Sequence, residues 1–376
     1  MVTKILIGNI IDSPAQTLIN TVNCVGVMGK GIALEFKKQF PDMYKDYEMR
    51  CQRGDVKLGE PYLYKSLLPP WILNFPTKDH WRSISNWDDI REGLEYLQNK
   101  YERWGITSLA VPPLGMGSGK LEWIKIGPFI YRYLNRLDIP VELYAPYGTP
   151  QEQLQIEFLE QEIQIEKSMM ITEEHLPAFI AVIEILRRIY SNRYHHHHSI
   201  GRTKLQKIAY IATVIGLVTG LQFQKRSYGP YSAELNNKLT SLVNSGLLIE
   251  QKRIRGYRFV YKIGSQFEES KMKYQAQLTE WDPIIEKTVD LFMRLDTRQS
   301  EIVATIIYSY HDLPRNNKNK PSELDVLNYV KGWKIRRRPP LDESEIADNI
   351  RNLAILGWLN VEYSPELPVS YDFDEF

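Results

Sequence analysis

Cysteine is nearly absent from this chain of 376 residues, in which only Cys24 and Cys51 occur. Two cysteines cannot build the disulfide framework of a small secreted protein, and their scarcity favours a reducing compartment. Long apolar runs are missing too, because the best candidate, residues 208–221, is interrupted by Gly216 and Gly220. The amino-terminus lacks the basic start and the apolar stretch of a signal peptide. We therefore expect a cytoplasmic protein with no membrane segment.

The chain also lacks an excess of either charge. Its 47 Lys and Arg residues nearly balance 46 Asp and Glu residues, which gives a net charge of +1. Contact with a polyanion would therefore have to come from a local cluster, such as residues 252–255 or 334–338. A run of four histidines at residues 195–198 is typical of a polar loop or a tag remnant. We expect no metal site.

The length predicts two or three domains. In the first 155 residues, short β-branched and aromatic runs alternate with helical periodicity, which predicts an α/β fold with a largely parallel sheet. The expected strands are residues 2–7, 18–22, 62–65, 72–75, 108–111 and 141–145. The expected helices are residues 31–40, 42–53, 88–104 and 122–136.

The pattern changes after residue 155. Residues 151–167 contain no glycine or proline, which predicts a solvated connecting helix, and we place a helical linker at 156–170. Residues 171–376 read as mainly helical, with strands that come late and in pairs. Helix, helix and hairpin follow one another in a winged-helix-like order, which divides this region into subdomains at 171–265 and 280–376. The expected details are a turn at 228–231, a helix capped by Ser232, a hairpin at 247–250 and 257–261, and a strand at 358–362.

Two glycine-rich segments follow expected strands of the first domain. The first contains Gly26, Val27, Met28, Gly29, Lys30, Gly31, Ile32 and Ala33, and the second contains Leu114, Gly115, Met116, Gly117, Ser118 and Gly119. Glycines at such junctions let backbone N–H groups approach a phosphate. Neither segment is a Walker loop or a dinucleotide fingerprint in its usual setting. Two such loops at the carboxyl edge of one sheet indicate a ligand with two phosphates.

Further polar residues fall at the same expected edge. Asn9 and Ile10 follow the first strand, where they could contact an adenine, and Asn23 follows the second, where it suits ribose hydroxyls. Lys78 comes after the fourth strand, where it could attack the anomeric carbon of a ribose or stabilise charge as a glycosidic bond breaks. Its neighbours Thr77 and His80 are candidate substrate contacts. A solvated basic loop is the alternative for this segment.

Taken in order, these segments resemble a macrodomain. More narrowly, they resemble the branch that contains terminal ADP-ribose protein glycohydrolase and the bacterial antitoxin DarG. The resemblance covers roughly residues 1–150 and implies a three-layer α/β/α fold with a mixed sheet over residues 1–155. It also implies ADP-ribose as ligand and no cofactor. The remainder is similar to the C-terminal region of DarG proteins, and residues 204–232 are more loosely similar to SocA-like antitoxin domains.

The resemblance implies the antitoxin of a DarT–DarG-type system, a hydrolase that removes ADP-ribose from thymidine in single-stranded DNA. The C-terminal region would bind the DarT-like toxin. Lys78 would be the catalytic residue, Asn23 would orient the distal ribose, and the glycine loops would hold the diphosphate. Macrodomains usually carry Asp where Asn9 stands here. The protein-directed glycohydrolase carries Asp in place of Gly119, and the absence of that Asp favours the DNA-directed branch.

Several alternatives remain open from the sequence. The first domain could bind ADP-ribose without turnover, with Lys78 structural, or could release ADP-ribose from proteins. The second region could be a DNA-binding regulator that uses the basic clusters at 252–255 and 334–338. The acidic and aromatic tail, residues 362–376, could imitate a nucleic-acid strand toward the toxin or be a disordered terminus.

Overall fold

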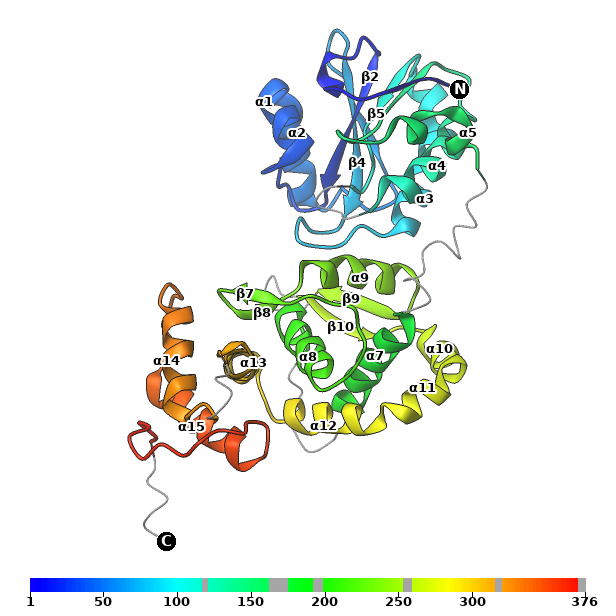
Figure 1. Cartoon of the computed structure of the whole chain (residues 1–376). Coiled ribbons are helices and arrows are strands. Elements are labelled where there is room, and N and C mark those ends of the chain that lie inside the picture. Colours follow the sequence, from blue (N-terminus) through cyan, green and yellow to red (C-terminus); the bar gives the residue numbers. More distant parts are fainter. Residues whose placement is uncertain (117–120, 162–174, 192–198, 253–258, 315–319, 371–376) are drawn as a thin grey trace. The chain divides into compact units, whose positions relative to one another are not determined.

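The computed structural model describes residues 1–116, 121–161, 175–191, 199–252, 259–314 and 320–370 (Figure 1). The chain divides into two compact units. One is formed by residues 1–170 with 240–245, and the other by residues 171–239 with 246–376. No helix in these ranges is long and apolar enough to cross a membrane. The histidine run, the 253–255 part of one basic cluster and the last six residues of the tail lie outside the described residues.

The first unit is built on a six-stranded sheet with the order β1-β6-β5-β2-β4-β3. Neighbouring strands are parallel except β3 and β4, so the sheet is mixed, as the resemblance implies. The strands are β1 (Val2–Leu6), β2 (Thr17–Asn23), β3 (Tyr62–Tyr64), β4 (Trp71–Lys78), β5 (Leu109–Val111) and β6 (Val141–Tyr144).

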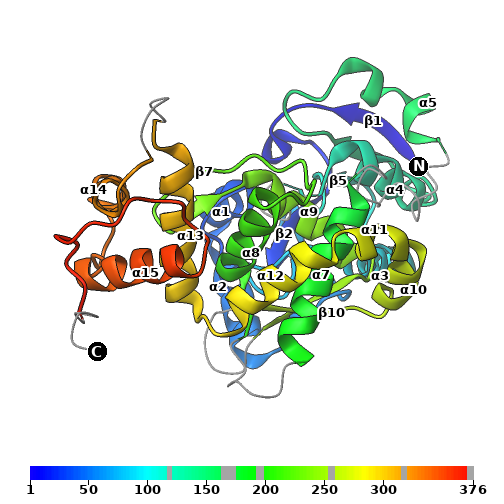
Figure 2. The same ribbon diagram turned by 60° about the horizontal axis from the view of Figure 1, so that its bottom comes forward.

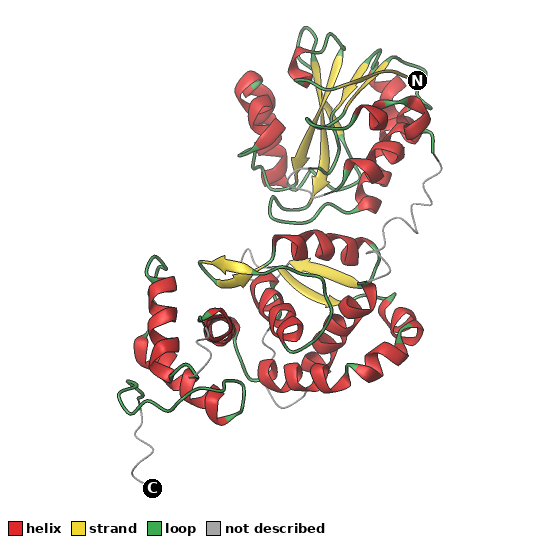
Figure 3. Cartoon of the chain, viewed as in Figure 1, coloured by secondary structure: helices red, strands yellow, loops and turns green. Residues whose placement is uncertain are grey.

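Helices cover both faces of this sheet (Figures 1 and 3). In β2, Leu18 packs in one apolar core with Phe36 and Tyr47, whereas Ile19 packs in a second core with Leu94. Neighbouring side chains of a strand point to opposite faces, so two cores form. The three-layer α/β/α prediction is confirmed. One face carries α1 (Gly31–Gln39) and α2 (Pro41–Arg53), and the other carries α3 (Trp87–Trp104) and α4 (Trp123–Leu134).

Strand β4 is longer than predicted, which changes where the functional residues lie. It continues through Pro76 to Lys78 instead of ending at Phe75. Asn74 is the last β4 residue that pairs with β3. Pro76 lies beyond Asn74, so the N–H group that proline lacks is not needed for a hydrogen bond to β3. Thr77 and Lys78 are therefore strand residues and not part of a solvated basic loop.

Residues 151–161 pack onto the first unit and do not form a solvated helix. They form a 3-10 turn, Gln151–Leu154, and the short helix α5 (Ile156–Leu159). Leu159 is only 1% exposed and belongs to the core shared with α4. The connecting-helix prediction is wrong here because Leu159 buries apolar surface, and its remainder, 162–167, lies outside the described residues.

The second unit is mainly helical, with two separate two-stranded sheets. Figure 2 shows α13, α14 and α15 side by side, and all three pack on one another. The helices are α7 (Leu176–Ser191), α8 (Arg202–Val214), α9 (Ala233–Asn244, of which residues 240–244 are grouped with the first unit), α10 (Phe267–Lys273), α11 (Gln275–Glu280), α12 (Asp282–Met293), α13 (Thr297–Asp312), α14 (Glu323–Lys334) and α15 (Glu343–Ile355). The strands are β7 (Gln224–Arg226), β8 (Gly229–Tyr231), β9 (Leu248–Lys252) and β10 (Phe259–Ile263).

The strand predictions in this unit have mixed outcomes. The hairpin expected at 247–250 and 257–261 is present as antiparallel β9 and β10, with Tyr261 opposite Glu250. The expected turn at 228–231 is mostly strand β8, which pairs with β7 in a hairpin that the sequence did not predict. The expected strand at 358–362 is wrong, because Glu362 makes only an isolated bridge with Ser322. The winged-helix-like order of residues 280–376 therefore lacks its strand among the described residues.

Buried polar side chains of α8 hold the segment that follows β8. The Gln206 amide accepts from the N–H of Ser232 at 2.9 Å and donates to its carbonyl at 2.8 Å. Lys207 donates to the carbonyl of Pro230 at 2.7 Å, and burial lowers the pKa of Lys207 to about 7. The predicted hydroxyl cap by Ser232 is wrong, since its buried Oγ has no hydrogen-bond partner among the described residues.

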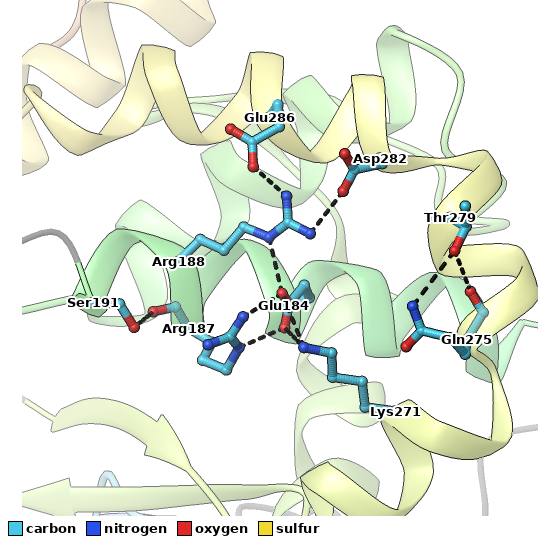
Figure 4. A network of polar contacts seen from close by, with 9 residues as sticks. All are labelled: Glu184, Arg187, Arg188, Ser191, Lys271, Gln275, Thr279, Asp282 and Glu286. Carbon is cyan, nitrogen blue, oxygen red and sulfur yellow. Dashed lines mark hydrogen bonds and ion pairs between the residues drawn. The ribbon is translucent and has the colours of Figure 1, made fainter.

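Glu184 of α7 is a buried carboxylate that links helices of the second unit (Figure 4). Its side chain is 1% exposed and pairs with Arg187 at 2.6 Å, Arg188 at 2.9 Å and Lys271 of α10 at 3.3 Å. Arg188 also pairs with Asp282 of α12 at 2.7 Å. Burial by itself would raise the pKa of Glu184, but the hydrogen bonds from Arg187 and Arg188 outweigh it and lower that pKa to about 2.

We expect Glu184→Gln to lower the free energy of unfolding by about 2 kcal/mol, because three partly exposed cations lose their shared counter-charge. A carboxyl whose pKa falls on folding stabilises the protein above its ordinary pKa of 4.5, and this contribution is lost as the pH falls toward 2. The variant should therefore lose part of the decline in stability below pH 4.5. Urea unfolding at several pH values measures both effects. Glu269→Gln, an exposed change on α10, is the control, and equal losses in the two variants would contradict this assignment.

Candidate active site

The carboxyl ends of β2 and β4 bring two of the predicted site residues together. Asn23 and Lys78 are register partners at the ends of these parallel strands. The N–H of Cys24 donates to the carbonyls of Lys78, at 3.2 Å, and Asp79, at 3.1 Å, which fixes this junction. Lys78 is 7% exposed and Thr77 is 4% exposed. The structure therefore places a shielded lysine directly beside the start of the first glycine loop.

Asn23 organises the first glycine loop. Its Oδ1 accepts from the N–H groups of Val25, at 3.0 Å, and Val27, at 3.3 Å, and its Nδ2 donates to the carbonyl of Val27 at 2.6 Å. Tyr47 of α2 donates to the Asn23 carbonyl at 2.7 Å and lies 3.1 Å from its Oδ1. Both ends of the Asn23 amide are thus used inside the loop, and the ribose contact stays a prediction.

The rest of the first loop leads into α1 and leaves its N–H groups available to an anion. Gly26 and Gly31 have positive φ values of 80° and 57°. Helix α1 begins at Gly31 with no side-chain cap from Lys30, so the N–H groups of its first turn, which includes Ile32 and Ala33, point out of the helix. This end of a helix favours negative charge.

Two predicted ligand contacts in this part of the sheet are buried side chains. Met28 is 2% exposed and packs in the core beneath α1 and α2, and Ile10 is also 2% exposed in that core. Both side chains contribute apolar packing, so only their backbones could touch a ligand. Val27, Gly29 and Lys30 are exposed. Asn9 is exposed as well and accepts from the N–H of Ile11 at 3.3 Å, which caps the short 3-10 helix Ile10–Asp12.

The second glycine loop is described only at its start. Leu114 is fully buried, Met116 packs partly buried against the core, and Gly115 has a φ of 70°. A Cβ on Gly115 would lie 2.6 Å from Leu121 and 2.7 Å from Ile90, so only glycine fits there. Gly117, Ser118 and Gly119 lie outside the described residues, with Lys120. Their predicted contacts with a diphosphate stay predictions.

The segment after Lys78 is ordered by aromatic contacts. His80 is 1% exposed, and its ring stacks on Trp81 with centroids 5.3 Å apart. Its Nδ1 accepts from the N–H of Arg82 at 3.2 Å. The Arg82 guanidinium lies 4.3 Å from the centre of the Trp81 ring. His80 therefore shapes this segment, and its contact with a substrate stays a prediction.

Sequence reasoning missed a row of polar side chains under the first loop. Asn20 of β2 donates to Oδ1 of its register partner Asn74 at 2.9 Å, and Asn74 donates to the Tyr62 hydroxyl at 3.1 Å. Oδ1 of Asn20 is buried and has no hydrogen-bond partner among the residues described. The available signal was an asparagine in the middle of each of two strands.

Asp89 was also missed, because in the sequence it is one acidic residue in a helical first turn. Burial, and then the charges of Glu92, Asp88 and Asp79, raise the pKa of Asp89 to about 6. The smallest of these contributions comes from Asp79, in the segment that follows Lys78. A perturbed carboxyl near a candidate site is a feature that functional sites often share. No group of three or more potential metal ligands occurs in the described part of the chain.

We expect Gly115→Ala to lower the free energy of unfolding by about 2 kcal/mol or more. An alanine there would have a strained positive φ, and its methyl group would overlap two side chains. Gly148→Ala is the matched control. Gly148 also has a positive φ, of 82°, but a Cβ there meets nothing within 4 Å, so it should lose only the backbone part, about 1 kcal/mol. Thermal unfolding compares the two, and an equal or smaller loss for Gly115→Ala would contradict the packing described.

Comparison with known proteins agrees with this geometry. The family model for the macro domain matches residues 19–126. A "DNA ADP-ribosyl glycohydrolase" of Thermus aquaticus is 35% identical over 239 residues, which cover 62% of each chain. A "DNA ADP-ribosyl transferase-DNA ADP-ribosyl glycohydrolase fusion protein" of Thermosipho africanus is 42% identical over 172 residues, 40% of this chain and 44% of that one. The match thus spans less than two thirds of these relatives' own length.

One solved structure is also similar in sequence to part of this chain. The macrodomain of Thermus aquaticus DarG is 42% identical, and the match covers 38% of this chain and 97% of that one, with a TM-score of 0.37. The family match falls on the unit that carries the mixed sheet and Lys78. Residues 19–126 thus match the macro domain family, and the chain is similar to the curated DNA ADP-ribosyl glycohydrolases.

Proposed function

We propose that this chain is the antitoxin of a DarT–DarG-type system and removes ADP-ribose from thymidine in single-stranded DNA. The observation that carries the proposal is the register pairing of Asn23 with Lys78, which sets a shielded lysine beside the first glycine loop. The relatives named DNA ADP-ribosyl glycohydrolase support the substrate class. A cytoplasmic location, where the toxin would meet DNA, is part of the proposal.

In this proposal the glycine loops hold the diphosphate and present the distal ribose to Lys78. Hydrolysis breaks the bond between the anomeric carbon and the base nitrogen, and water supplies a hydroxyl to the carbon and a proton to the base. Lys78 can act in two ways. As an ammonium group it stabilises the negative charge that develops on the departing base, and as a free amine it attacks the anomeric carbon to form an imine that water then cleaves.

The modified thymine has to lie against Lys78 for either route. A base in a duplex cannot reach a lysine at a sheet edge, so an unpaired or extruded base is required. Release from protein side chains is the alternative activity. Gly119 stands where the protein-directed glycohydrolase has Asp, which favours DNA.

We expect Lys78→Ala to lower the rate of ADP-ribose release from ADP-ribosylated single-stranded DNA by at least about 100-fold, while ADP-ribose still binds. Lys57→Ala, an exposed change in the same unit, is the control. Lys78→Arg separates the two routes, because it keeps the charge but cannot form the imine. Retained turnover in Lys78→Arg favours charge stabilisation, and a product trapped on wild-type Lys78 by cyanoborohydride favours covalent attack.

Parallel incubation with an ADP-ribosylated protein tests the substrate class. Release from DNA alone supports the proposal, whereas release from protein alone contradicts it. Unchanged release by Lys78→Ala contradicts the role of this lysine. Binding of ADP-ribose without release from either substrate by the wild type would show a non-catalytic binding module.

The second unit is proposed to bind and sequester the toxin, which agrees with the relative in which transferase and glycohydrolase are fused. We expect the full chain with Lys78→Ala, which cannot reverse the modification, still to inhibit a DarT-like transferase when the two are equimolar. The measurement is the initial rate of DNA ADP-ribosylation by the transferase, with the same amount of an unrelated protein as control. An unchanged initial rate would contradict sequestration and leave hydrolysis as the antitoxic activity.

A further inference from the structure

Two segments of the second unit, far apart in sequence, are linked by a hydrogen bond and by buried ion pairs. They are residues 226–228, at the tip of the β7–β8 hairpin, and residues 335–338, directly after α14. Lys334 donates to the carbonyl of Ser227 at 2.8 Å and pairs with Glu301 of α13 at 3.0 Å. Arg337 pairs with both oxygens of Glu301, at 2.8 Å and 3.1 Å.

These bonds correct the prediction that the cluster at 334–338 contacts phosphate as a whole. The side chains of Lys334 and Arg337 are only 4% and 9% exposed, and that of Glu301 is 4% exposed. Two of the four cations in the cluster are therefore structural. Burial, and then the hydrogen bond from Arg337, act in opposite directions on Glu301, and the net effect lowers the pKa of its carboxyl.

The remaining cations near this anchor are exposed, and Arg338 also donates to the carbonyls of Ile335, at 3.2 Å, and Arg337, at 2.9 Å. Arg226, Arg336 and Arg338 are exposed and form no ion pair in the described ranges. Nearby acids are already engaged, since Asp312 pairs with Lys225 at 2.8 Å and Glu343 pairs with Lys331 at 2.7 Å. In a chain with a net charge of +1, these three arginines concentrate positive charge locally.

An exposed aromatic ring lies within the same surface. Tyr228, at the hairpin tip, is 58% exposed, and the Arg337 guanidinium lies 5.9 Å from the centre of its ring. Ile335, next to the exposed arginines, is 73% exposed. We call this set the hairpin surface, which consists of Arg226, Tyr228, Ile335, Arg336 and Arg338.

We propose that the hairpin surface binds a single-stranded nucleic acid, with the three arginines on its phosphates and Tyr228 stacked on a base. Cations and an exposed ring on one surface are the elements of sequence-tolerant single-strand binding. The buried anchor on Glu301 fixes the two segments before binding, which lowers the entropic cost of association. An acidic protein surface would pair with the arginines but would leave the exposed ring of Tyr228 without a role, so a nucleic acid fits the surface better. The proposal does not depend on the glycohydrolase activity.

The test is binding of the full chain to unmodified, fluorescently labelled oligothymidylate, measured by anisotropy at several salt concentrations. Combined Arg226, Arg336 and Arg338→Ala should weaken binding at least about tenfold and lower the salt slope by about 2, because each phosphate that an arginine neutralises contributes roughly 0.7. Tyr228→Ala should weaken binding about tenfold with little change in slope. Combined Lys262, Lys273 and Arg294→Ala, three exposed cations elsewhere in the unit, is the charge-matched control and should bind like wild type.

Three results of the nucleic-acid binding measurement would overturn the proposal. They are no binding by the wild type at low salt, an equal loss of affinity in the control variant, and tighter binding of a duplex than of a single strand. Oligouridylate distinguishes RNA from DNA, and binding of either strand supports the proposal. If the combined arginine variant still binds nucleic acid but no longer binds a DarT-like toxin, the hairpin surface is a protein interface and the proposal is wrong. The variants replace exposed side chains, so their unfolding temperatures should match that of the wild type.

Discussion

The parallel pairing of β2 with β4 is the constraint on which the proposed site depends. It places the end of one strand, at Asn23, level with the end of the other, at Lys78. The polar contact of Asn20 with Asn74 crosses the same pair of strands within the core. Because Asn23 and Tyr47 then hold the first glycine loop, the loop and the lysine occupy one edge of the sheet.

Much of the first unit could be predicted from sequence because its signals are local. Apolar runs and helical periodicity predicted the strands and helices, and the ordered motifs predicted the mixed sheet and the macrodomain. Local signals could not predict that β4 continues past Pro76. Proline normally ends a strand unless the N–H that it lacks would face an unpaired edge of the sheet. They also could not show that Met28 and Ile10 face the core or that both ends of the Asn23 amide are used within its own loop.

Charges in the second unit show where sequence reasoning was weakest. A run of basic residues looks uniformly solvated, yet Lys334 and Arg337 are held by Glu301 from another helix. Glu184 likewise forms ion pairs with three cations of neighbouring helices or of its own helix. Partners from another helix are distant in sequence and carry no local pattern. What the sequence marked correctly was the presence of charge, and only the fold separates the anchoring cations from those that remain exposed.

The central claim is that the loop edge of the macrodomain positions an ADP-ribose with its distal ribose at Lys78. A crystal structure of the full chain with ADP-ribose tests this most directly. The account predicts the diphosphate on backbone N–H groups of the first glycine loop and at the start of α1, with the anomeric carbon of the distal ribose near the Lys78 ammonium group. A ligand bound away from this edge, or one whose distal ribose points away from Lys78, would contradict it.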